Sequence, residues 1–199
     1  RYTQLSDLYL QVKINADLFL FKALAKILFM WEEERGNIIN KDFIANHTHG
    51  FTELKDSLKN YDLDELITNS GLTKDEVFLA ADKIAKSEKI ILCWAMGWTQ
   101  HVNAVEVIQE GVNLLLLKGS IGKAGAGLCP VRGNSNVQGD RTMGIFEKPT
   151  DSFMDRLEES FNTKFPRKYG YDVVEAIQAM HAGKAKVFIA MGGNFVSAT

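Results

Sequence analysis

The sequence predicts an α/β fold in which Rossmann-like layers of parallel sheet are covered by helices. Two segments carry this prediction. Residues 89–96 and 186–190 are short apolar runs, and each follows a helical stretch. A strand that is apolar on both faces is typical of a parallel sheet between helices. Both runs lead into Ala-Met-Gly, at 95–97 and 190–192, and ligands of open α/β sheets bind just beyond such strand ends.

The longest predicted helix covers residues 16–34. We expect Asn15 to cap its first turn and Gly36 to end it. The polar side chains of this helix occupy one thin stripe, which indicates burial on most of its circumference. That stripe consists of Lys22, Lys26 and Glu33.

Shorter helices are predicted on both sides of the first strand. Thr73 and Glu76 have the spacing of a capping box and predict a helix over residues 74–87. After the first strand, Val105, Ile108, Val112 and Leu115 share one face of a further helix. The remaining predicted helices cover residues 41–46, 52–59, 62–69 and 151–162, and a last one carries Val173, Ile177 and Met180 on one side and ends at Gly183.

Residues 111–148 have an unusual composition. Seven of the 16 glycines of the chain lie between positions 119 and 144, among Asn, Ser, Gln and Asp residues. This composition predicts neither a helix nor an ordinary strand. We interpret it as an ordered loop that presents backbone N–H groups to a polar, phosphorylated ligand. A long crossover between domains has the same composition, so that alternative stays open.

The composition limits the classes of function. The net charge is −2 and no basic block is present, which argues against general binding of nucleic acid or membrane surfaces. The apolar runs are too short to span a bilayer. Two cysteines, 36 positions apart, match neither a disulfide framework nor a metal-ligand spacing, so we expect a reducing cytoplasm. His47 and His49 have no carboxylate or cysteine at ligand spacing, and we assign no metal ligand.

The strand ends supply the first candidate binding residues. Thr99, Gln100 and His101 follow the first strand, although His101 in this position can equally cap a helix. Arg132 lies in the glycine-asparagine segment and can face an anion, or it can form a structural ion pair with Asp140. The dinucleotide fingerprint, the nucleophile elbow and a Ser-His-Asp order are all missing. From the residues alone, the sequence predicts a ligand-binding α/β segment.

Three stretches resemble the molybdopterin oxidoreductase family, in particular its formate dehydrogenase-like alpha (catalytic) subunits. They are GWTQH at 97–101, NLLLLKGSIGKAGAGLCPVRGNSNVQGD at 113–140 and AMGGN at 190–194. The resemblance implies an enzyme that holds molybdenum or tungsten between two pyranopterin guanine dinucleotides (bis-molybdopterin guanine dinucleotide). Each dinucleotide would be bound by one of two related α/β domains. The corresponding domains here would be residues 1–146, ending in the glycine-rich cofactor loop, and 147–199, the start of a second segment.

The resemblance also implies roles for single residues. Arg132 would orient a small anionic substrate during two-electron transfer. The formate enzymes have glutamine two residues further on, where this chain has the shorter Asn134, so the resemblance predicts a substrate other than formate. The implied cofactor-binding residues are Gly97, Thr99, Gln100, His101, Gly133, Asn136, Gln138, Gly139, Asp140, Gly192, Gly193 and Asn194.

In that family the metal-ligating residue and an iron–sulfur cysteine cluster lie N-terminal to this region. We therefore expect an internal fragment that is inactive alone, with an electron-transfer partner that the sequence does not identify. Neither Cys93 nor Cys129 has the context of a metal ligand. The alternative is a non-catalytic α/β module that binds a nucleotide or serves assembly.

Overall fold

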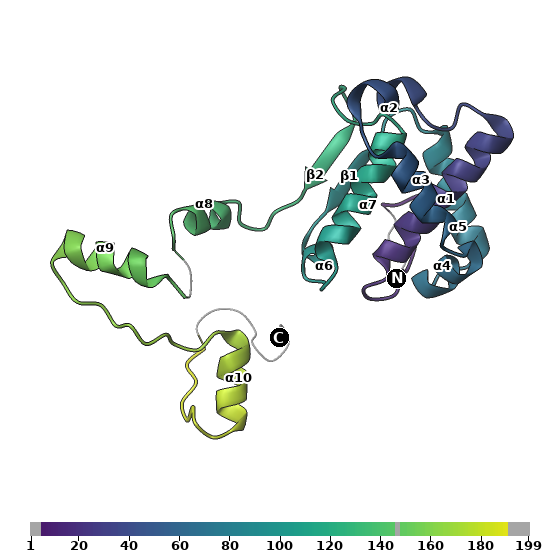
Figure 1. The fold of residues 1–199 in the computed structure, drawn as a ribbon. Coiled ribbons are helices and arrows are strands. Elements are labelled where there is room, and N and C mark those ends of the chain that lie inside the picture. Colours follow the sequence, from purple (N-terminus) through teal and green to yellow (C-terminus); the bar gives the residue numbers. More distant parts are fainter. Residues whose placement is uncertain (1–4, 146–147, 191–199) are drawn as a thin grey trace. The chain divides into compact units, whose positions relative to one another are not determined.

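A computed structural model describes residues 5–145 and 148–190, and it divides into two units (Figure 1). The first unit comprises Arg1–Arg132 and the second comprises Gly133–Thr199. The domain boundary expected after residue 146 stays a prediction.

Helix α1 (Asp17–Arg35) is the centre of the first unit, and nine of its residues are buried. It packs against α3, α4, α5 and α7, so the prediction of a helix buried on most sides is confirmed. Ile27 and Leu28 are fully buried in this core. The helices around α1 are α2 (Lys41–His47), α3 (Phe51–Lys59), α4 (Leu63–Ser70), α5 (Lys74–Lys86) and α7 (Ala104–Leu117).

Local capping signals account for most helix ends. The Thr73 side chain accepts from Glu76 N, and the Glu76 carboxylate accepts from Thr73 N, which confirms the capping box of α5. Gly36 ends α1 as predicted. The predicted cap by Asn15 is wrong: Ala16 is the N-cap residue and provides no side-chain hydrogen bond. Asn15 has φ = 62° and serves the turn before the helix instead.

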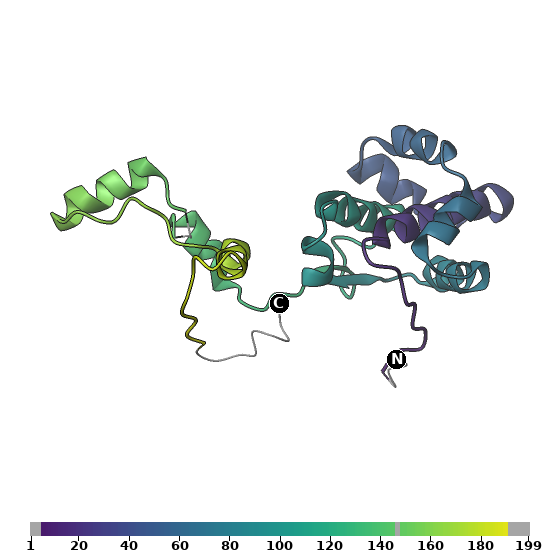
Figure 2. The same ribbon diagram turned by 90° about the horizontal axis from the view of Figure 1, so that it is seen from below.

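The sheet consists of β1 (Ile91–Trp94) and β2 (Gly127–Pro130), which are parallel. Helix α7 connects the two strands, so the unit contains a β–α–β arrangement and the α/β class is confirmed. Figure 2 shows α1 and α7 on the same side of the strands. Leu92 faces this side and packs against the core. Ile91 faces the other way and is 56% exposed. The described residues therefore cover only one face of the strand, and for them the prediction of a strand buried on both faces is wrong.

Helix α7 approaches the sheet closely at Gly111. A Cβ atom at this position would lie 2.8 Å from Leu92 Cδ2, so the contact depends on glycine. The close approach fixes the rotation of the helix about its axis. In this rotation Val105 is 68% exposed. The prediction that Val105 belongs to the buried face of the helix is wrong. The buried face consists of Val107, Gly111, Leu114, Leu115 and Leu117.

The second unit contains three helices in its described residues: α8 (Asn136–Thr142), α9 (Asp151–Phe161) and α10 (Val173–His181). Helices α9 and α10 are confirmed predictions. Helix α8 and strand β2 correct the expectation that residues 119–144 contain neither helix nor strand. Residues 186–190 form no strand, which is also a correction. A strand requires a hydrogen-bonded neighbour, and no described segment pairs with these residues.

Ion pairs hold the segments of the second unit to its helices. The Arg167 guanidinium lies 2.7 Å from Asp155 Oδ1 and 2.8 Å from Glu158 Oε2. Lys148 lies 3.0 Å from Glu175 Oε1, at the first turn of α10. These groups are largely exposed, so we expect each pair to contribute little to stability.

Candidate functional site

The carboxyl ends of β1 and β2 form one edge of the sheet, because the strands are parallel. Pairing continues past the strand ends, since Val131 N donates to Trp94 O at 2.7 Å. The chain leaves β1 into the single turn α6 (Met96–Thr99), and it leaves β2 towards Arg132. The structure thereby places the predicted residues 97–101 and Arg132 at the same edge of the first unit.

Trp98 anchors the turn that follows β1. Its Nε1 donates to Asp17 Oδ1 at 2.9 Å, which ties the turn to the start of α1. The indole packs edge-on against Phe21, with 5.1 Å between ring centroids, and stacks on Trp94 at 5.7 Å. The sequence marked the turn only as a strand end. The structure shows that aromatic contacts of the half-buried Trp98 and a charge-assisted hydrogen bond fix its position.

Two buried polar atoms at this edge lack a hydrogen-bond partner among the described residues. They are His101 Nδ1 and Asn103 Oδ1. Asn103 is the N-cap residue of α7, but its side chain does not cap the helix. Because an unsatisfied buried polar atom is costly, both positions fit a polar ligand that completes their hydrogen bonds. The first N–H groups of α7 add donors and a partial positive charge at the same place.

The other predicted residues of this edge are open to solvent. Gly97, Thr99 and Gln100 are exposed. A Cβ atom at Gly97 would meet no other atom within 4 Å, and this glycine does not have a positive φ. The described residues therefore leave space for an approaching group at Gly97.

The remaining predicted cofactor residues belong to the second unit, and those that the structure describes are exposed. Most lie on α8, which replaces the expected loop; Thr142 Oγ1 donates to Gln138 O there at 2.9 Å. Their participation in a shared site stays a prediction. Gly192, Gly193 and Asn194 lie outside the described residues. The described residues of this set are Gly133, Asn136, Gln138, Gly139 and Asp140, and Asn134, which is predicted to be catalytic, is exposed as well.

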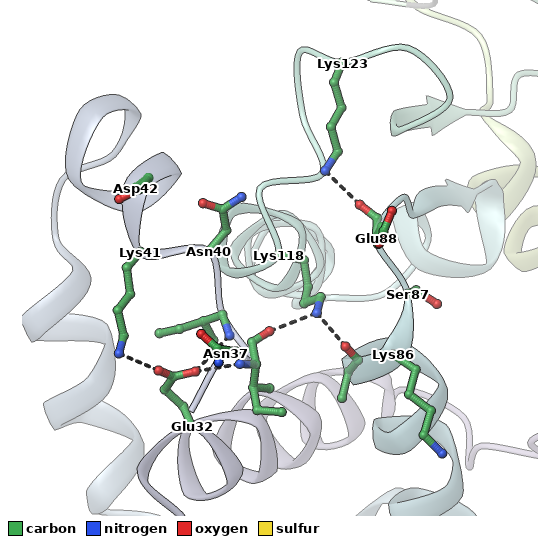
Figure 3. A pocket seen from close by; sticks show the side chains of 13 residues that line it. Glu32, Asn37, Asn40, Lys41, Asp42, Lys86, Ser87, Glu88, Lys118 and Lys123 are labelled. Atoms are coloured by element: carbon green, nitrogen blue, oxygen red, sulfur yellow. Dashed lines mark hydrogen bonds and ion pairs between the residues drawn. The ribbon is translucent and has the colours of Figure 1, made fainter. Parts of the chain in front are cut away.

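A polar cavity of about 760 Å³ lies where α1, α5 and α7 end, near the start of β1 (Figure 3). Lys118 follows α7 directly and is buried. Its Nζ donates to Ile38 O and to Ala85 O, both at 2.8 Å. Ala85 lies in the last turn of α5, where carbonyls carry partial negative charge, and Ile38 lies between α1 and α2, so this ammonium group joins the end of α5 to the segment that follows α1. Burial lowers the pKa of Lys118, and the nearby charge of Lys123 adds to the shift.

Glu32 forms the opposite wall of this cavity, and its side chain is 8% exposed. Its carboxylate accepts from Ile38 N at 2.7 Å and Ile39 N at 3.1 Å, and it lies 2.6 Å from Lys41 Nζ. Burial acts to raise the pKa of Glu32, but these hydrogen bonds outweigh it, and the pKa is held below its usual value. Glu32, Lys41 and Lys118 thus bind partners within the protein. The cavity is therefore a structural feature, at the edge opposite the candidate site.

Within residues 5–145 and 148–190, no group of three or more His, Cys, Asp or Glu residues could hold a metal ion. No helix in the same residues is both long and apolar enough to cross a membrane.

The geometry thus defines an α/β unit with a candidate site at one edge of its sheet, and the comparisons with known proteins indicate its class. No family model matches the sequence. The chain is 43% identical over 196 residues to an uncharacterised oxidoreductase of Mycobacterium tuberculosis, with 98% of the chain and 25% of the relative covered. It is 41% identical over 201 residues to protein YdeP of Escherichia coli, covering 98% of the chain and 26% of that protein.

A formate dehydrogenase alpha subunit of Methanocaldococcus jannaschii is 30% identical over 197 residues, which cover 95% of the chain and 28% of the subunit. Acetylene hydratase from Pelobacter acetylenicus shares the fold, with a TM-score of 0.55 and 24% identity over 61% of this chain and 16% of that one. The chain is homologous to a segment of proteins named as oxidoreductases, a formate dehydrogenase alpha subunit among them. The resemblance expected from the sequence is confirmed. The chain spans about a quarter of the length of these relatives.

Proposed function

We propose that the chain is part of a formate dehydrogenase-like oxidoreductase that uses a molybdenum or tungsten bis-pyranopterin guanine dinucleotide. The observation that carries this proposal is the pair of unsatisfied buried atoms, His101 Nδ1 and Asn103 Oδ1, at the sheet edge. The pterin and guanine rings of such a cofactor offer both donors and acceptors, and its phosphates suit a helix N-terminus. The similarity to oxidoreductases along 94–98% of the chain supports the same function.

The residues of the chain would have distinct tasks. His101 and Asn103 would complete their hydrogen bonds on the bound group, while Gly97 leaves room for its approach. The cofactor, when bound, supplies the two-electron redox chemistry. Arg132 would orient a small anionic substrate by a charge-assisted contact. The side-chain amide of Asn134 would act beside it, with a shorter reach than the glutamine of the formate enzymes. The shorter amide favours a substrate other than formate.

Elemental analysis and pterin fluorescence of the purified parent protein test the proposal. We expect one molybdenum or tungsten ion per chain in the unaltered protein. His101→Ala and Asn103→Ala should each lower metal and pterin content, because the ligand then loses a hydrogen bond. His47→Ala, at the end of α2, is the control and should retain full content. A parent protein without metal and pterin, from a host that makes the cofactor, would refute the proposal.

Catalytic turnover separates the role of Arg132 from cofactor retention. Arg132→Lys keeps the charge but loses the bidentate geometry, so we expect turnover of a small anionic substrate to fall while metal content is unchanged. Efficient formate oxidation by the unaltered protein would contradict the inference drawn from Asn134.

The second candidate function is a non-catalytic module that binds a nucleotide or serves assembly. The free helix N-terminus at α7 also suits a simple nucleotide phosphate. This alternative predicts a parent protein that contains neither metal nor pterin.

A further inference from the structure

The exposed face of the sheet carries the two cysteines of the chain next to each other. In the parallel register, Cys93 of β1 is paired with Cys129 of β2. Both are free thiols and both are exposed. Residues paired in neighbouring strands point to the same side of a sheet. The sequence separation of 36 positions gave no hint of this contact, because the pairing arises only when α7 returns the chain to the sheet.

The spacing of strands permits a covalent bond at this position. Neighbouring strands lie about 4.8 Å apart, and disulfides join residues whose Cα atoms are about 4.4–6.8 Å apart. A hydrogen bond between the Cys93 and Cys129 thiols supports their proximity. The pKa of Cys93 is raised, first by partial burial of its sulfur and then by a hydrogen bond and the charge of Cys129.

We propose that Cys93 and Cys129 form a reversible disulfide across the two strands, by exchange with a low-molecular-weight disulfide such as oxidised glutathione. One thiolate attacks a sulfur of the small disulfide and releases one small thiol. The second cysteine then attacks the mixed disulfide and releases the other. Two electrons pass from the protein thiols to the small disulfide, and the two thiol protons end on the released thiols.

The position of this bond links it to the candidate site. Cys93 lies three residues before the turn that begins at Met96, and Cys129 lies three residues before Arg132. A bond between them would fix the spacing of the two chain segments that leave the sheet edge. The proposal does not depend on the identity of the ligand, because it concerns the face of the sheet and not the edge.

Mass spectrometry of the full chain tests the proposal. The reduced chain is incubated with oxidised glutathione, quenched in acid and measured intact. We expect the mass to fall by two hydrogens, a linked peptide that contains positions 93 and 129, and full reversal by dithiothreitol. Closure should be faster in the folded chain than in urea, because the register holds the thiols together.

Single-cysteine variants are the matched controls. Cys93→Ser and Cys129→Ser should each keep the circular dichroism spectrum of the unaltered chain and gain one glutathione that remains attached. Glutathione bound stably to both cysteines of the unaltered chain would overturn the proposal. A disulfide-linked dimer, or closure only in urea, would overturn it as well.

Discussion

The hydrogen bond between Trp98 and Asp17 offers a direct test of how the candidate edge is held in place. We would change Trp98→Phe, which keeps an aromatic ring beside Phe21 and Trp94 but removes the indole N–H donor. A hydrogen bond to a charged group contributes about 1.5–3 kcal/mol to stability. Both side chains are half-buried, so we expect the lower end of this range.

Trp98→Phe alone also removes ring area. Asp17 lies in the first turn of α1, where its charge also interacts favourably with the helix dipole. A double-mutant cycle with Asp17→Asn separates these effects, because contributions outside the pair cancel. We expect a coupling free energy of about 1.5 kcal/mol. The assay is urea unfolding of the chain, followed by far-ultraviolet circular dichroism. A coupling below about 0.5 kcal/mol, the usual error of additivity, would refute the view that this bond ties the turn to the core.

Four further substitutions test separate features. Thr73→Ala should destabilise the chain by about 1 kcal/mol in urea unfolding through loss of the α5 cap, and an unchanged midpoint would contradict this. Gly97→Ala should leave the unfolding midpoint nearly unchanged but lower the cofactor content of the parent protein. Gly71→Ala should instead destabilise the chain, because Gly71 has φ = 84° and an added Cβ would lie 2.5 Å from Lys13. The folded-state pKa of Glu32 is lowered, so its contribution to stability is present above the unfolded pKa and is lost as the pH falls through the folded pKa. Glu32→Gln should flatten this acid limb of the stability profile, and an identical pH dependence of the two proteins would show that Glu32 does not cause it.

The sequence was a sound guide wherever structure depends on neighbours along the chain. The capping pair Thr73 and Glu76 could be predicted because both partners lie within one helical turn. The burial of α1 followed from a periodic pattern within a single helix. The sheet was predicted less well. Strand β2 contains a glycine and a proline, and it becomes a strand only through its pairing with β1.

The candidate site shows the same division. Residues 97–101 could be located because they follow an apolar strand. The sequence did not indicate Asn103 as a site residue, because an asparagine before a helix is usually an ordinary N-cap. Only the structure shows that its side chain neither caps α7 nor has another hydrogen-bond partner among the described residues. The anchoring of Trp98 by Asp17 joins positions 81 residues apart, and no local pattern indicates such a contact.

The two-stranded sheet also has a consequence for the motions of the chain. Four residue pairs hold β2 to β1, and the described residues cover only one face of these strands. A sheet of this size is marginally stable alone, whereas α1 is enclosed by packed helices. We therefore expect the amide protons of β2 to exchange with solvent through local opening, well before those of α1, which require global unfolding. The segment that carries Arg132 would then be the most readily released part of the candidate site.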